Sequence, residues 1–430
     1  MASATIAASR AIVLLAAMVP ARAVAQTAAP TERSGPLPGP TAAPKQRNVT
    51  PAGLWERPDL LGDFGGARSA LAARGLSFGL IETSEVLGNP TGGIRQGAVY
   101  EGLTEASLGL DLDRLIGLPG GVINASAFQI HGRGLSTNNI GNLNNVSSIE
   151  ATRATKLFEL WYDQSFGGTV DLKLGQLAAD QEFLISEYSG ALMNSTSFGW
   201  PELPSADVPS GGPIYPLATP GIRARWLINP AWTVLAGVYN GNPAGPGTGD
   251  PQRRDASGTL FRVGDGVFAI AEAQFTVAGG TTKAGIWYGS RGTASPYVMV
   301  DQLVYRVPGT LDQGVGVFAR VMAVPGAAPS KPNPVSAFLD AGVTFKGLLP
   351  GRGSDTAALG VSATRVSPTV GHRDEGIVEL TYQYQAAPWW LIQPDLQYVI
   401  NPGGGVPDPQ RPARRIADAP VIGLRTVLTF

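Results

Sequence analysis

The stretch Ala98–Leu112, AVYEGLTEASLGLDL, alternates between two kinds of residue. Its even-numbered positions are mostly apolar, whereas its odd-numbered positions include Glu101, Glu105, Ser107 and Asp111. Successive side chains of a β-strand point to opposite faces, so this segment would carry one apolar face and one acidic face. The pattern therefore predicts a strand with one face in water and the other in apolar surroundings.

The same period of two recurs along the chain. Val170, Leu172 and Leu174, for example, alternate with Asp171 and Lys173. We expect strands over roughly 76–87, 98–112, 121–132, 155–164, 168–177, 220–228, 232–240, 266–277, 281–289, 296–306, 314–323, 335–346, 356–366, 375–385, 389–400 and 420–430. The gaps between these segments are alternately long and short, and outer-membrane barrels combine an even strand number with long external loops and short periplasmic turns. We therefore predict an all-β fold, a 16-stranded antiparallel transmembrane β-barrel.

Composition supports a membrane location and excludes several functions. Only 15% of the 430 residues are Asp, Glu, Lys or Arg, against about 25% in an ordinary soluble domain. A net charge of −1 provides no basic surface for nucleic acid. The absence of cysteine excludes disulfides and thiolate metal sites. Because the chain has only two histidines, His131 and His372, we expect no metal centre, and we expect no other cofactor.

The N-terminal region has the layout of an export signal. Arg10 precedes the apolar run Ala11–Val19 and a small-residue stretch that ends at Ala25. We expect a signal peptide over 1–25 with cleavage before Gln26, and a Pro-rich disordered tether over 26–58, which contains seven prolines. The barrel, with a short N-terminal helical segment, would occupy 59–430. No later run approaches the 18 apolar residues of a transmembrane helix.

The C-terminal segment ends on an aromatic residue. Ile422, Leu424, Leu428 and Phe430 share one parity. A barrel that closes on its last strand needs this terminus paired and facing lipid, whereas an ordinary edge strand would leave an exposed apolar edge. We expect the outer-membrane barrel assembly machinery to act on the strand that ends at Phe430.

Several longer motifs resemble those of a known family. They are LGDFGGAR at Leu61–Arg68, QIHGRG at Gln129–Gly134, GQLAAD at Gly175–Asp180, NST at Asn194–Thr196, FGWP at Phe198–Pro201, PSGGPIYPLATPGIR at Pro209–Arg223, GDPQRR at Gly249–Arg254 and DAPVIGL at Asp418–Leu424. Over about residues 54 to 430 the chain resembles the carbohydrate-selective porins of outer membranes, the OprB-like family. The resemblance implies a sixteen-stranded porin for monosaccharides, with a charged constriction narrowed by inward-folded loops. It also implies a short helix near the N-terminus, which Ala67–Arg74 followed by Gly75 would fit.

A sugar channel must exchange hydrogen bonds with hydroxyl groups without holding the sugar too tightly. Carboxylates accept such bonds, guanidinium groups donate them, and an aromatic ring can cover the apolar face of a pyranose. We assign the substrate path to residues of these types: Glu101, Glu105, Arg133, Asp180, Arg223, Arg225, Glu272, Arg320, Trp161 and Trp287. Glu379, Asp395 and Arg425 also lie at the alternating positions that we expect to face the water-filled lumen. The alternative for each is a solvated wall residue that pairs across the lumen, and the long gap 178–219 could be an external cap instead of an inward loop.

The preferred function is passive, substrate-selective diffusion of monosaccharides such as glucose across the bacterial outer membrane, without enzymatic chemistry. Lipid and lipopolysaccharide would surround the barrel, and the sequence leaves open whether three barrels form a homotrimer. One alternative is a general or anion-preferring porin, although anion pores favour rings of Arg and Lys. The other is a membrane hydrolase, which needs a histidine beside a lipid-facing serine. The expected positions of His131 at a rim and His372 in a turn argue against it.

Overall fold

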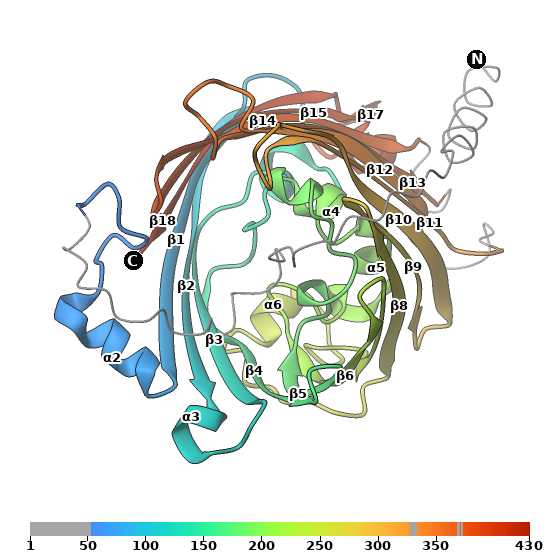
Figure 1. The fold of residues 1–430 in the computed structure, drawn as a ribbon. Helices are drawn as coiled ribbons and strands as arrows, with labels where there is room; N and C mark the ends of the chain where they lie inside the picture. The colour runs from blue at the N-terminus through green and yellow to red at the C-terminus, as the bar shows by residue number, and fades with distance from the viewer. Residues whose placement is uncertain (1–52, 327–332, 368–369, 371–372) are drawn as a thin grey trace. The chain divides into compact units, whose positions relative to one another are not determined.

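Sixteen strands form a closed antiparallel barrel in the computed structural model, which describes residues 53–326, 333–367, 370 and 373–430 (Figure 1). The barrel strands are β1 (Leu76–Asn89), β2 (Gly97–Asp111), β3 (Gly121–Gly132), β4 (Ala154–Phe166), β5 (Val170–Leu177), β6 (Thr219–Asn229), β7 (Trp232–Asn240), β8 (Val267–Val277), β9 (Gly280–Gly289), β10 (Thr293–Arg306), β11 (Gly314–Ala323), β12 (Val335–Lys346), β13 (Thr356–Val366), β14 (Glu375–Ala387), β15 (Trp390–Ile400) and β18 (Ala419–Thr429). Each strand pairs with its neighbour in sequence, and β18 pairs with both β15 and β1. All sixteen predicted strands are therefore confirmed, with ends that differ by a few residues.

Short elements occupy the segments between the barrel strands. Before β1 lie η1 (Phe64–Gly66) and α2 (Ala67–Ala73), and α3 (Leu112–Ile116) joins β2 to β3. The predicted N-terminal helix is confirmed as α2, which ends just before Gly75 at φ +89°. The long connections contain η2 (Ser136–Ile140), η3 (Ala179–Gln181), η4 (Ser189–Ala191), α4 (Ser195–Phe198), α5 (Glu202–Asp207), η5 (Pro209–Gly211), α6 (Pro251–Arg254), α7 (Pro402–Gly405), β16 (Pro407–Asp408) and β17 (Arg411–Arg415).

The two faces of the wall differ as the alternation in sequence predicts. In β2, Tyr100 points outward and is 47% exposed, whereas the next residue, Glu101, points inward and is 3% exposed. The outward positions Val298 and Val300 of β10 are apolar and exposed in the same way. A closed barrel pairs its backbone groups between strands, which the hydrocarbon interior of a membrane requires.

The barrel closes between its first and last strands. Glu85 of β1 lies opposite Arg425 of β18 in this register. The backbone N–H of Phe430 donates to the carbonyl of Leu80 at 2.9 Å, and Arg68 of α2 donates to the Phe430 oxygen at 2.8 Å. The C-terminal residue is thus tied to both the first strand and the preceding helix.

Two long connections pack against the inner wall. We call residues 133–153 L2 and residues 178–218 L3. L3 lies inside the barrel in Figure 1, where α4 and α5 run beside strands of one half of the wall. Leu203 and Val208 of L3 share a buried apolar cluster with Phe268, Trp287 and Phe338 of the wall. This apolar packing leaves the opposite half of the wall, near β1 to β6, to line the remaining space.

The segments in which we expect a signal peptide and most of a Pro-rich tether, residues 1–52, lie outside the described residues, and so does His372. Within the part of the chain that the structure describes, no helix is both long enough and apolar enough to cross a bilayer.

The outward face of β10 offers a test of membrane depth. Val300→Arg places a charge near the middle of the strand, whereas Val304→Arg places it near the end of the strand at Arg306. We expect Val300→Arg to lower the free energy of unfolding by about 2–4 kcal/mol and Val304→Arg by about 0–1 kcal/mol, because the cost of a cation falls towards the interface. Urea unfolding in lipid vesicles measures both. Equal losses would contradict a bilayer centred on the strand.

Candidate functional site

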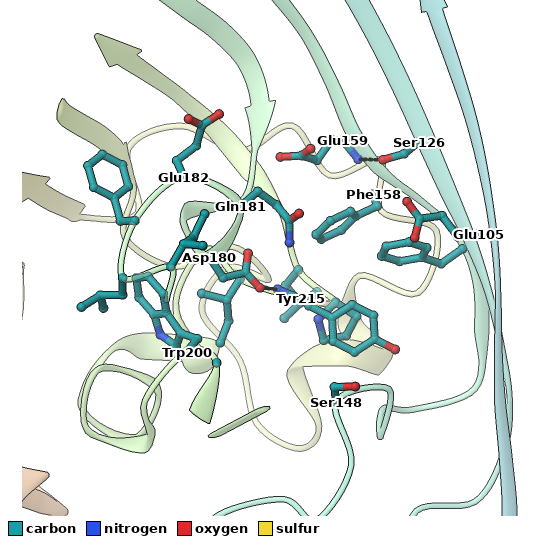
Figure 2. A pocket seen from close by; sticks show the side chains of 18 of the residues that line it. Glu105, Ser126, Ser148, Phe158, Glu159, Asp180, Gln181, Glu182, Trp200 and Tyr215 are labelled. Carbon is teal, nitrogen blue, oxygen red and sulfur yellow. Dashed lines mark hydrogen bonds between the residues drawn. The ribbon is translucent and has the colours of Figure 1, made fainter. Parts of the chain in front are cut away.

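A cavity of about 1120 Å³ lies inside the barrel (Figure 2). Its walls come from β1 to β6 on one side and from L2 and L3 on the other. Glu105 and Ser126 contribute from β2 and β3, while Asp180, Glu182 and Tyr215 contribute from L3. The cavity is therefore enclosed by polar and aromatic groups from both the wall and the loops.

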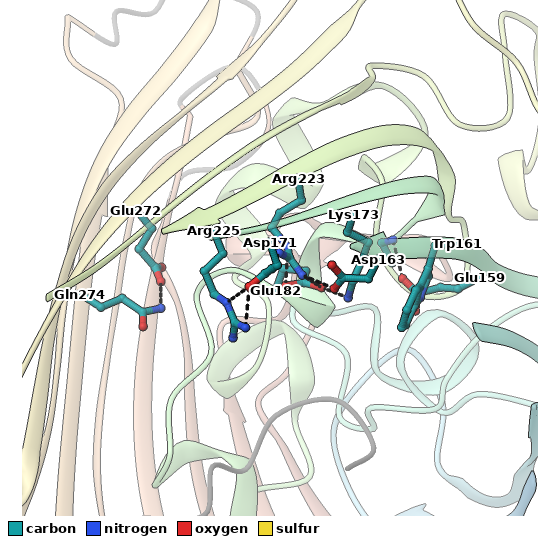
Figure 3. Close-up of polar contacts among 11 residues, drawn as sticks. Glu159, Trp161, Asp163, Asp171, Lys173, Glu182, Arg223, Arg225, Glu272 and Gln274 are labelled. Atoms are coloured by element: carbon teal, nitrogen blue, oxygen red, sulfur yellow. Dashed lines mark hydrogen bonds and ion pairs between the residues drawn. The ribbon is translucent and has the colours of Figure 1, made fainter. Parts of the chain in front are cut away.

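A row of alternating charges lines one side of this cavity (Figure 3). We call it the charged ladder, and its members are Asp163, Asp171, Lys173, Glu182, Arg223 and Arg225. Arg223 pairs with Asp171, with Asp163 at 3.3 Å and with Glu182 at 3.0 Å. Arg225 donates from Nε to Asp171 at 2.7 Å, and Lys173 pairs with Glu182. Three cations thus face three carboxylates.

Strand register explains this arrangement. Asp163 of β4 lies opposite Lys173 of β5, and Lys173 lies opposite Arg223 of β6. Asp171 lies opposite Arg225 in the same pairing. Directly opposed residues of neighbouring strands point to the same face, so these side chains all face the lumen. Arg223 is almost fully buried in the ladder, whereas the side chain of Arg225 is 40% exposed.

Trp161 borders the ladder on the same wall. The Lys173 ammonium lies 4.1 Å from the centre of its ring, and the indole N–H donates to Glu159 at 3.2 Å. These contacts fix the orientation of the ring. The structure thus brings Trp161, Arg223 and Arg225 together beside one cavity, and it places Glu105 on another part of the same lining.

Asp180 lies in η3 at the start of L3. It accepts a hydrogen bond from the backbone N–H of Tyr215 at 3.0 Å. Tyr215 in turn donates its hydroxyl to the carbonyl of Ile149 in L2 at 2.9 Å. Burial raises the pKa of Asp180 to about 6. Asp180 lines the cavity and also connects the two ends of L3.

Glu272 and Arg320 lie away from the cavity lining and hold L3 to the wall. Glu272 accepts from the backbone N–H of Leu184 at 3.1 Å and from the hydroxyl of Tyr297 at 2.9 Å. Arg320 donates to the carbonyls of Leu184 at 3.2 Å, Ser197 at 3.0 Å and Gly199 at 2.6 Å, and it pairs with Asp340 at 2.5 Å. Both charges are therefore occupied by loop and wall groups.

Trp287, Glu101 and Arg133 also lie outside the cavity lining. Trp287 is fully buried and stacks on Phe268 in the apolar cluster beneath L3, with ring centres 6.1 Å apart. Glu101 is buried opposite Glu85 on the inner wall. Arg133 is exposed at the start of L2, where its backbone N–H donates to Tyr100 at 2.9 Å. The structure does not bring these three residues to the ladder.

The predicted site residues do not include Glu375 and Glu379, two carboxylates that bind backbone N–H groups of L2 and L3. Glu379 accepts from the backbone N–H of Met193 at 2.5 Å and of Asn194 at 3.0 Å. Glu375 accepts from the backbone N–H of Asn144 at 2.8 Å. The ladder residues Asp171 and Lys173 were visible on the wet parity of the sequence. The loop groups that these carboxylates bind could not be predicted, because the alternation of residues describes only the strands of the wall.

Comparisons with known proteins agree with this architecture. The family model described as "Carbohydrate-selective porin, OprB family" matches residues 95–297 and 289–430. The chain is 24% identical to Porin B of Pseudomonas aeruginosa, over 85% of this chain and 90% of that protein. It is 23% identical to a putative porin, QuiX, of Acinetobacter baylyi, over 87% and 94% respectively.

Solved structures show the same fold. The high-pH structure of Pseudomonas putida OprB matches with a TM-score of 0.75 and 22% identity, covering 87% of this chain and 99% of that one. The low-pH structure of the same protein matches with a TM-score of 0.59 and 20% identity over the same shares.

The contacts of Arg320 predict that its side chain stabilises the position of L3 inside the barrel. Arg320→Met would leave Asp340 buried without its cation and remove donors from three L3 carbonyls. Breaking a buried ion pair costs about 3–5 kcal/mol, so we expect L3 to become cleavable by chymotrypsin and the channel current to become noisier. Arg365→Met is the control, because its pair with Asp374 is exposed and such pairs contribute about 0–1 kcal/mol. An L3 as resistant as in the wild type would contradict the anchoring role.

The carboxyl group of Asp207 in α5 predicts a pH dependence of the same loop. Burial raises its pKa from 3.8 to about 7. The packed loop therefore binds more protons than the unfolded one, so the stabilisation is complete below about pH 4 and is lost as the pH rises through about 7. We expect L3 to resist protease better at pH 5 than at pH 8, and Asp207→Asn to reduce that difference.

Asp265→Asn is the control for the pH experiment. Asp265 is only partly buried and lies outside L3, and its hydrogen bond from Arg262 lowers its pKa. This variant should keep the wild-type dependence between pH 5 and pH 8. A wild-type loop that becomes more resistant as the pH rises would show that Asp207 does not control its packing.

Proposed function

The chain belongs to the OprB family of carbohydrate-selective porins, and from this premise we propose that it lets monosaccharides such as glucose diffuse passively across the outer membrane through a lumen narrowed by L2 and L3. The observation that carries the proposal is the charged ladder beside Trp161 on the cavity wall. The ladder provides both hydrogen-bond donors and acceptors, and the indole provides an apolar surface.

The charge balance of the ladder favours neutral solutes. Its three cations and three carboxylates pair with one another. Such a wall lacks the excess of Arg and Lys that anion pores use. Hydroxyl groups of a sugar can exchange with the charged hydrogen bonds, which are directional and short. Each contact must remain weak enough for release, and the partial exposure of Arg225 leaves its donors within reach of a solute.

We assign roles to the residues on this path. Glu105 and Asp180 would accept hydrogen bonds from sugar hydroxyls, Arg225 and Arg223 would donate them, and Trp161 would cover the ring face. Glu272, Arg320 and Trp287 would act indirectly by holding L3 in place, and Glu101 would support the wall beneath L2. Arg133 would lie at the entrance.

A general or anion-preferring porin remains the second candidate function. A hydrolase is disfavoured by the contacts of His131, whose Nε2 lies 3.1 Å from the Tyr100 hydroxyl and 3.5 Å from Glu82. A serine protease-like site would instead need this nitrogen beside a serine hydroxyl.

Liposome swelling tests the proposed path with two tryptophans of opposite orientation. Trp161→Ala removes a ring that lines the cavity, whereas Trp226→Ala removes one that is exposed on the outer wall. We expect Trp161→Ala to lower the rate for glucose relative to glycerol by roughly 2- to 10-fold, the equivalent of one aromatic contact. Trp226→Ala should leave that ratio unchanged.

Two results would contradict this proposal. One is an unchanged ratio of glucose to glycerol rates in Trp161→Ala. The other is a wild-type channel whose conductance in planar bilayers is blocked by phosphate more strongly than by glucose, which would favour the anion-preferring alternative.

A further inference from the structure

Arginine residues are concentrated at one part of the barrel rim. We call this group the arginine patch, and its members are Arg365 of β13, Arg373 before β14, and Arg411, Arg414 and Arg415 of β17. All five residues are exposed, and Figure 1 shows β17 on the same side of the barrel as β13 and β14. The connections after β13 and β15 lie at the same end of the barrel as L2 and L3, which follow β3 and β5. The arginine patch therefore belongs to the external rim.

Two connections that are separate in sequence meet in the arginine patch. The backbone N–H of Arg373 donates to the carbonyl of Gly404 in α7 at 3.0 Å. At the next residue, Gly405, an added Cβ atom would lie 3.3 Å from Cδ of Arg373 and 3.4 Å from Nη1 of Arg415. Gly404 and Gly405 are themselves buried. The side chains of Arg373 and Arg415 therefore lie close together over a covered segment of backbone.

Two members of the arginine patch have carboxylate partners. Arg365 pairs with Asp374 at 3.3 Å, and Arg411 pairs with Asp408 at 3.0 Å. The buried Asp408 also accepts from the backbone N–H of Gln410 at 2.8 Å. The charge of each of these two guanidinium groups is thereby balanced by a neighbouring carboxylate.

The other three members have no carboxylate partner among the described residues. Arg373 donates to the side-chain oxygen of Asn401 at 3.4 Å, which is a neutral acceptor. Arg414 and Arg415 form no ion pair with any described residue. Asp418, the third carboxylate of the two connections, accepts from the backbone N–H of Asn401 at 2.8 Å. The arginine patch therefore has an excess of positive charge that an external anion can meet.

The outer wall below the arginine patch is apolar. Arg365 shares the outward parity of Leu359 and Val361 of β13, which are both exposed. Because a strand rises about 3.3 Å per residue, the backbone of Arg365 lies about 13 Å above that of Val361. On β15 the exposed Tyr398 lies opposite the exposed Val378 of β14. Cations at the rim thus stand directly above a surface that suits acyl chains.

This arrangement suits an anionic lipid of the outer leaflet. Guanidinium groups bind phosphate through two parallel hydrogen bonds, and such charge-assisted bonds are roughly twice as strong as neutral ones. Lipid A, the lipid anchor of lipopolysaccharide, carries phosphate groups on its sugar headgroup directly above its acyl chains. A free phosphate ion would match the cations of the arginine patch but would make no contact with the apolar wall beneath them.

We propose that the arginine patch is a binding site for the phosphate groups of lipid A, whose acyl chains then cover the outer wall of β13, β14 and β15. Arg373, Arg414 and Arg415 supply the charge that the phosphate groups neutralise. The pair of Arg365 with Asp374 lies between the headgroup and the apolar wall. The inference depends on the position of the barrel in the outer membrane and not on the substrate proposed above.

Native mass spectrometry of the full chain in detergent micelles tests this site. Lipid A with two phosphate groups is titrated in the presence of EDTA, so that no divalent cation joins phosphate to carboxylate. We expect Arg373→Gln combined with Arg414→Gln and Arg415→Gln to weaken binding by roughly 10- to 100-fold, because each basic residue at a lipid surface contributes about a factor of five. A folded-barrel band on an unheated gel confirms that the triple variant folds.

The matched control removes three exposed arginines from other external connections, as Arg153→Gln, Arg253→Gln and Arg291→Gln together. This control should bind lipid A as the wild type does. Lipid A without phosphate groups should bind the wild type only as weakly as the intact lipid binds the triple variant, and inorganic phosphate at the same phosphate concentration should not compete. Unchanged binding in the triple variant, an equal loss in the control, tight binding of the dephosphorylated lipid, or competition by inorganic phosphate would overturn the proposal.

Discussion

The absence of hydrogen-bonding solvent in a membrane is the constraint on which the rest of this structure depends. Every backbone N–H and C=O that crosses hydrocarbon needs a partner from the chain itself. Sixteen strands meet this need only because β18 returns to pair with β1. Closure in turn gives each strand a lipid face and a lumen face, which is why the sequence alternates with a period of two. The ladder on β4, β5 and β6 follows from that alternation together with the strand register.

The requirement that every buried backbone group has a hydrogen-bond partner also divides the lumen into two halves. L3 enters the barrel with backbone groups that are removed from bulk water, and the wall supplies their partners. Glu379, Glu272 and Arg320 bond to N–H or C=O groups of L3. Hydrogen bonds to charged groups contribute about 1.5–3 kcal/mol each, so several together hold a loop with little regular structure. These charges are thereby used structurally. On β5 and β6, Lys173 and Arg223 also pair with Glu182 of L3, whereas Arg225 stays partly exposed beside the cavity.

Much of the wall could be predicted from the sequence, and the lumen much less. Strand positions and the inward direction of Arg223 follow from local patterns that act over a few residues, whereas the short helix at Ala67–Ala73 was implied by the family resemblance. The partners of Arg320 do not, since Leu184 is 136 positions away and lies in a loop without a period. Trp287 illustrates the difference. Its parity predicts that it faces inward, but only the fold of L3 decides that it packs beneath a loop.

The outer wall shows how a departure from the alternation can be informative. A charged residue on the lumen parity needs no special explanation, because that face is wet. Glu82 and His131 have the opposite parity, and the local rule predicts apolar residues at their positions. Natural proteins break such rules chiefly where another requirement acts. Here the departure involves adjacent strands with matching register and hydrogen bonds among the side chains, so the requirement acts on a surface and not on a single residue.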